Sequence, residues 1–141
     1  MFELHPQLAA DCVVLGDFPL SRVLLNRDSN YPWFILVPRR VGLTEIYQLP
    51  AAERGQLLEE SCRLGELLMA VFGGDKLNVA ALGNMVPQLH VHHIVRRIGD
   101  AAWPGPVWGA VPMRAYGEVA LNEMLGKLLP QLSEIGLIAA I

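Results

Sequence analysis

The stretch Val86-Pro-Gln-Leu-His-Val-His-His-Ile-Val-Arg-Arg97 holds three of the four histidines of the chain within an apolar run. The β-branched and aliphatic residues at 89–95 predict an extended strand, in which side chains alternate between two faces. Gln88, His90 and His92 are therefore predicted to share one face. The other face, which is apolar apart from one histidine and is predicted to meet the core, carries Leu89, Val91, His93 and Val95.

Length and composition predict one domain over residues 1–141. A chain of 141 residues that is 52% apolar and 18% charged can bury a single core without disulfides or structural metals. The net charge of −3 gives no general electrostatic attraction for nucleic acid, so an anionic ligand must be held by local groups.

The two cysteines, Cys12 and Cys62, follow no metal-binding or redox spacing and are predicted to be buried, reduced thiols. The amino-terminal residues lack the profile of a signal peptide, and no apolar run reaches the roughly 18 residues of a membrane helix. These features predict a cytoplasmic protein that does not enter a membrane.

The pattern of short strands and two helices predicts an α+β fold. Besides the histidine strand, β-branched or aliphatic runs bounded by turn residues predict strands at 12–17, 20–27, 33–37 and 76–82. A long amphipathic helix is predicted at 51–72, ended by Gly73, and a last helix at 117–129, ended by Pro130. The apolar residues of the long helix cover more than one stripe, which predicts a homodimer through this helix and a neighbouring strand.

Two imidazoles on one face of a strand suit two kinds of chemistry. Neutral imidazole offers one lone pair and one N–H near neutral pH, so His90 and His92 are candidates for nucleophilic or acid–base work. His-x-His pairs also bind zinc, but a zinc site needs further ligands. The candidates are Gln88, a poor zinc ligand, and His5, which is remote in sequence. The spacing alone leaves both alternatives open.

The neighbouring sequence resembles the histidine triad family, whose motif is His-x-His-x-His-x-x with apolar x. Here the motif stands as Gln88-Leu-His90-Val-His92-His-Ile94, preceded by Gly83-Asn-Met-Val-Pro87. The strand Trp33-Phe-Ile-Leu-Val-Pro-Arg39, the long helix and the strand with Asn78 also come in the family's order. The resemblance implies an antiparallel sheet of about five strands, packed helices and two-fold dimers around the long helix.

The resemblance also implies a nucleotide hydrolase or transferase that acts at an α-phosphate. His90 matches the nucleophile, which forms a covalent nucleotidyl-histidine that water then opens. His92 matches the histidine that hydrogen-bonds the phosphate or leaving-group oxygen. Gln88 occupies the first motif position, where the family usually has histidine, and a glutamine cannot take up a proton. This chemistry requires no cofactor and no metal.

Candidate ligand-binding groups flank the motif. Backbone N–H groups of Gly83, Asn84 and Met85 and the side chains of Asn84 and Asn78 are predicted to contact phosphate. The resemblance places the ribose contact at residues 26–28, on Asn26 or Asp28. Three functions remain open: hydrolysis of nucleoside phosphoramidates or dinucleoside polyphosphates, nucleotide binding with little turnover because of Gln88, and metal binding by His90 and His92.

Overall fold

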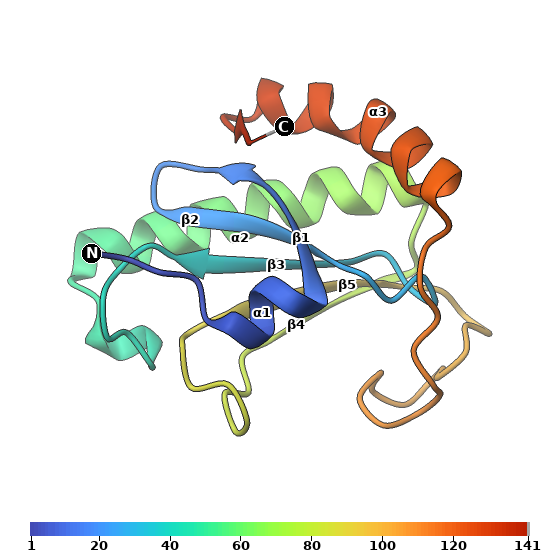
Figure 1. Ribbon diagram of the computed structural model, residues 1–141, viewed down its shortest axis with the longest axis horizontal. Coiled ribbons are helices and arrows are strands. Elements are labelled where there is room, and N and C mark those ends of the chain that lie inside the picture. Colours follow the sequence, from blue (N-terminus) through green and yellow to red (C-terminus); the bar gives the residue numbers. More distant parts are fainter. Residues whose placement is uncertain (141) are drawn as a thin grey trace.

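The computed structural model describes residues 1–140, and these residues form one open antiparallel sheet with helices on both faces (Figure 1). The strand order is β4-β5-β3-β2-β1-β6, and every pair is antiparallel. The predicted α+β class and antiparallel sheet are confirmed. The strands are β1 (Cys12–Asp17), β2 (Ser21–Asn26), β3 (Trp33–Pro38), β4 (Lys76–Ala80), β5 (Val91–Arg96) and β6 (Ile138–Ala139).

The described residues contain six strands, where the sequence predicts about five. The additional strand is β6, a two-residue segment that pairs with β1 at Gly16 and Asp17. A Cβ atom at Gly16 would stand 2.3 Å from the carbonyl oxygen of Ile138. Glycine therefore permits the close backbone approach that lets the carboxy-terminal segment join the sheet.

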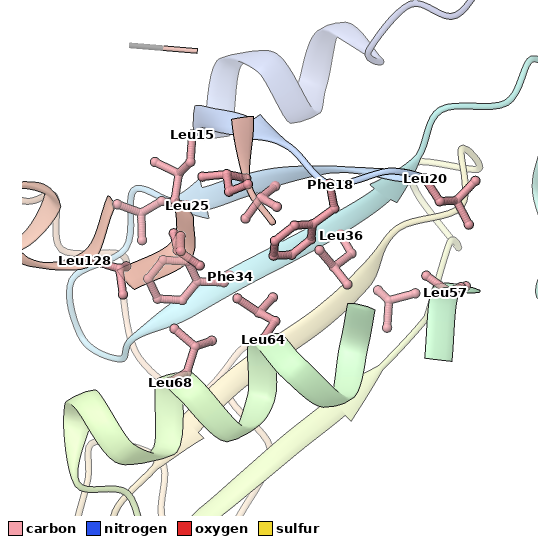
Figure 2. Close-up of a cluster of buried hydrophobic side chains, with 14 of the residues drawn as sticks. Leu15, Phe18, Leu20, Leu25, Phe34, Leu36, Leu57, Leu64, Leu68 and Leu128 are labelled. Atoms are coloured by element: carbon pink, nitrogen blue, oxygen red, sulfur yellow. The ribbon is translucent and has the colours of Figure 1, made fainter. Parts of the chain in front are cut away.

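Two helices cover one face of the sheet. Helix α2 (Ala51–Phe72) and helix α3 (Glu118–Glu134) pack on the same hydrophobic cluster, and Figure 2 shows Leu64 and Leu68 of α2 beside Phe34 of β3. Gly73 ends α2 in the left-handed conformation, as predicted.

The predicted end of the last helix is wrong. Pro130 lies inside α3, which continues to Glu134. Leu128 and Leu132, on either side of the proline, are both fully buried, so packing holds the helix together. The proline removes one hydrogen bond to the carbonyl of Gly126, and this residue is exposed, so water can satisfy its carbonyl group.

The other face of the sheet is covered by short segments. Helix α1 (Pro6–Asp11), the residues before it and the loop that contains Val107 pack on a second cluster around Trp33 and Ile35. Figure 1 shows α1 and the loop at 81–90 on the side of the sheet away from α3.

No helix within residues 1–140 has the length and apolar character needed to cross a membrane. Cys12 is buried as predicted, whereas Cys62 is exposed on α2.

Candidate functional site

The predicted separation of the histidines between two faces is confirmed. The rings of His90 and His92 lie 4.9 Å apart, centroid to centroid, on the face that carries α1. His93 points the other way, toward α2, where its Nε2 accepts the hydroxyl proton of Ser61 at 2.7 Å. The strand itself is shorter than predicted: β5 begins at Val91, so Gln88 and His90 belong to the segment that leads into it.

His90 has one nitrogen committed to the backbone. Its Nδ1 lies 2.6 Å from the carbonyl oxygen of Gln88, and because a carbonyl can only accept, Nδ1 carries the proton. The lone pair is therefore on Nε2. His90 is buried, with 7% of its surface exposed. The backbone thus prepares the unprotonated nitrogen of a buried imidazole, which is the form that a nucleophile needs.

His92 has the opposite tautomer. The indole Nε1–H of Trp33 donates to His92 Nδ1 at 3.0 Å, which leaves the proton of His92 on Nε2. Burial lowers the pKa of His92 to about 3, and the neighbouring His90 and His93 act in the same direction. His92 is therefore a neutral hydrogen-bond donor beside the His90 nucleophile. Trp33 was not among the predicted site residues, although an indole at the start of an apolar strand signals a buried N–H that needs a partner.

The loop after β5 packs against His92 through Trp108. The ring of Trp108 stands nearly perpendicular to His92, with centroids 5.1 Å apart. An ion pair anchors the loop: Arg96, 2% exposed, binds both carboxylate oxygens of Asp100, at 2.8 and 2.9 Å. The hydrogen bonds from Arg96 are the main cause that lowers the pKa of Asp100 to about 2. Arg96 also lies against the ring of Trp103, so Trp103 packs against the Arg96–Asp100 ion pair. Trp108, in contrast, packs on His92.

The Gln88 side chain binds the amino-terminal arm, defined as residues 1–5. Its Nε2 donates to the carbonyl of Glu3, and its Oε1 accepts the backbone N–H of His5, both at 2.9 Å. Phe2 and Leu4 of this arm pack on the same cluster as Trp33. The glutamine at the first motif position therefore holds the amino-terminal arm against the protein, while its own backbone carbonyl orients His90.

The predicted phosphate-binding groups fall into two sets. Gly83, Asn84 and Met85 form a loop just before the motif, in which Gly83 is half-buried and the other two are exposed, and their N–H groups make no hydrogen bond to the described residues. Asn78 shares the face of His92, since it pairs with Ile94 of β5. Its Oδ1, however, accepts from Arg96 at 2.8 Å, so Asn78 supports the loop anchor.

Asn26 and Asp28 line a cavity of about 310 Å³ together with Trp33. One oxygen of Asp28 accepts from the side chain and backbone of Asn30 and from the backbone of Arg114, and Asn26 Oδ1 accepts the N–H of Asp28. These bonds fix the turn after β2. Trp33 connects the cavity with the histidines, because its ring lines the cavity and its N–H binds His92.

His93 is the buried core histidine that the sequence predicts. It is fully buried, and its Nδ1 donates to the carbonyl of Val91 at 3.1 Å. Burial lowers its pKa to about 4, although the hydrogen bond to Val91 acts in the opposite direction.

Within residues 1–140, no group of three or more histidine, cysteine, aspartate or glutamate residues is placed to hold a metal ion.

Comparisons with known proteins show the family and the fold. The HIT domain family matches residues 7–99. A histidine triad protein from Marinobacter aquaeolei VT8 is 56% identical, with a TM-score of 0.92 over 95% of this chain and 98% of that one. Histidine triad proteins from Bradyrhizobium japonicum and Sinorhizobium meliloti 1021 are 46% and 35% identical, each with a TM-score of 0.89 over 92% of this chain and 96% of theirs.

A search of the curated proteins finds no match. The family match covers more than half of the chain, and the similarity to the Marinobacter protein extends over nearly all of it. The chain therefore belongs to the HIT domain family, the histidine triad family, whose members are generally nucleotide hydrolases or transferases.

Proposed function

We propose that this protein hydrolyses nucleotidyl compounds at the α-phosphate through a covalent nucleotidyl-His90. The observation that carries the proposal is the hydrogen bond of 2.6 Å between His90 Nδ1 and the Gln88 carbonyl. It leaves the Nε2 lone pair free for attack. Membership of the HIT domain family supports the same reaction class.

The reaction divides one displacement into two. In the first step Nε2 of His90 attacks the α-phosphorus, the bond from phosphorus to the leaving group breaks, and its electron pair departs with that group. In the second step a water oxygen attacks the same phosphorus, the P–N bond breaks, and its electron pair returns to Nε2. The water proton passes to solvent, and a nucleoside monophosphate is released. Neither step needs a cofactor or a protein-bound metal.

The remaining groups bind the substrate. His92 donates its Nε2–H to a phosphate oxygen, and the free N–H groups of Gly83, Asn84 and Met85 contribute further donors there. The cavity lined by Asn26 and Asp28 receives the nucleoside, whose ribose hydroxyls suit amide and carboxylate partners. Dinucleoside polyphosphates and nucleoside phosphoramidates are the substrate classes that combine a nucleoside with such an α-phosphate.

A second candidate function is nucleotide binding with little turnover. The observation in its favour is the Gln88 side chain, which cannot take up a proton and is bound to the arm at Glu3 and His5. Turnover of a good substrate distinguishes the two functions.

We also propose that the protein is a cytoplasmic homodimer. In the single chain, the buried residues of α2 form one stripe, whereas Leu58 on the same helix is 65% exposed. The neighbouring β4 is an open edge of the sheet, and Val79 on it is 50% exposed. A two-fold contact of α2 and β4 with a second copy would cover both surfaces.

The experiment compares His90→Ala with the unaltered protein on adenosine phosphoramidate and on a dinucleoside polyphosphate. Loss of the nucleophile abolishes hydrolysis of both, while nucleotide affinity stays within roughly tenfold, because few binding contacts are removed. His92→Ala slows turnover but still permits covalent capture. His5→Asn, which keeps a capping side chain at the start of α1, serves as the histidine control. Full activity in His90→Ala contradicts the mechanism.

A further inference from the structure

We propose that Trp33 is a positioning residue that holds His92 as a neutral Nε2–H donor, so that His92 clamps the substrate phosphate and does not protonate the leaving group. The inference rests on the proposed function for its site and deepens it. It also selects among substrates: a phosphoanhydride, whose leaving phosphate departs as an anion, suits this site better than a phosphoramidate, whose amine must gain a proton.

The contact fixes the tautomer without ambiguity. An indole nitrogen can donate a hydrogen bond but cannot accept one, so the Nδ1 of His92 must be the acceptor at 3.0 Å. The contact of Ser61 with His93 would not fix a tautomer by itself, because a hydroxyl can donate or accept; there the Val91 carbonyl decides which nitrogen carries the proton. Trp33 therefore determines where the single proton of neutral His92 resides.

The surroundings prevent His92 from turning away from this bond. Trp33 is the first residue of β3 and pairs with Ile94, so its side chain lies diagonally beside His92 on the same face of the sheet. Trp33 and His92 are 7% and 6% exposed. Trp108 packs edge-on against both rings, and the centroid of its ring lies 5.7 Å from that of Trp33 and 5.1 Å from that of His92.

Protonation of His92 would require the loss of this arrangement. A proton on Nδ1 would face the indole N–H, so the bond must break inside a site where neither group reaches water freely. The charged form would also lie beside His90, 4.9 Å away, and near His93 on the opposite face of the same strand. The pKa of His92, lowered to about 3 chiefly by burial, agrees with this geometry.

The consequence concerns the first chemical step. As Nε2 of His90 bonds to phosphorus, the electron pair of the breaking bond leaves on the departing atom. His92 stabilises charge on the phosphate oxygens, and its Nε2 proton stays in place. Gln88, at the other flank of the motif, carries no titratable group. A departing phosphate chain keeps the electron pair as an anion, whereas a departing amine takes its proton from solvent.

The test uses ¹⁵N NMR of the histidine rings in the full-length protein, unaltered and as Trp33→Phe. Phenylalanine keeps a large apolar ring and removes the N–H. Trp108→Phe is the matched control, since it also removes an indole N–H beside His92 but leaves the bond to Nδ1 intact. In the unaltered protein, Nδ1 of His92 has the shift of an unprotonated nitrogen, and the ring stays neutral down to pH 5. In Trp33→Phe, its titration midpoint rises by at least one pH unit, and in Trp108→Phe it rises less.

Kinetics provide the second readout. The ratio of kcat/KM for a dinucleoside polyphosphate to that for a phosphoramidate is predicted to fall at least fivefold in Trp33→Phe, because His92 gains the ability to carry a proton. A proton on Nδ1 of His92 in the unaltered protein overturns the inference, and this result does not depend on the variant folding. An unchanged midpoint in a folded Trp33→Phe also overturns it. Neither result affects the nucleotidyl-His90 proposal, which is tested by covalent capture.

Discussion

The bond between Gln88 and the amino-terminal arm makes a quantitative prediction. Gln88→Met keeps the length of the side chain and removes both hydrogen bonds, to the Glu3 carbonyl and the His5 N–H, each 2.9 Å long. At about 0.5–1.5 kcal/mol for each bond, the free energy that holds the arm falls by about 1–3 kcal/mol. The arm is a terminal segment, so the loss appears as local opening and not as global unfolding.

Hydrogen exchange of backbone amides measures this effect directly. The N–H of His5 is predicted to exchange about 5- to 150-fold faster in Gln88→Met, which corresponds to about 1–3 kcal/mol, whereas amides of the central strands keep their rates. Gln131→Met is the matched control, because that amide lies on α3 and donates only to the carbonyl of Lys127. Gln88→His, which places in the chain the residue that the family usually has, is predicted to free the arm as well, since an imidazole cannot donate and accept side by side as an amide does. Unchanged exchange at His5 in both variants would refute the assignment of Gln88 to the arm.

Three further predictions follow from buried or exposed side chains. Burial lowers the pKa of His93 from 6.5 to about 4 in the folded protein, so between these pH values the unfolded chain binds more protons at this residue than the folded chain. The contribution of His93 to stability is complete above pH 6.5, and about 3 kcal/mol is lost as pH falls to 4. His92, with its pKa lowered to about 3, acts in the same direction, so urea unfolding at several pH values should show a loss of at least this size, and a flat profile contradicts it. Asp100→Asn keeps one acceptor oxygen but removes the negative charge that compensates the buried Arg96, and urea unfolding should show a loss of about 3–5 kcal/mol, with faster exchange in the loop that carries Trp108. Leu58→Glu should convert a dimer into monomers in sedimentation at micromolar concentration, and a monomeric unaltered protein would disprove the dimer.

The local pattern was sufficient to predict the arrangement of the histidines. Alternation along a strand depends only on backbone geometry, so His90 and His92 could be assigned to one face and His93 to the core. The glycine that ends α2 acts through its own backbone conformation and was predicted for the same reason.

The features that the sequence did not reveal depend on contacts between distant segments. The bond from Trp33 to His92 requires the register in which Trp33 pairs with Ile94, and no local pattern defines that register. The binding of Gln88 to the arm spans 85 residues between its side chain and Glu3. Pro130 misled the prediction because local propensity ends a helix at proline, while burial of leucines on both sides continues it.

During turnover, His90 is expected to become covalently nucleotidylated. The most direct measurement is mass spectrometry of the protein quenched during turnover of a dinucleoside polyphosphate, followed by peptide mapping. We expect a nucleoside monophosphate bound to Nε2 of His90, retained in the His92→Ala variant and absent from His90→Ala. Hydrolysis at a normal rate with no adduct on His90, or an adduct on another residue, would contradict it.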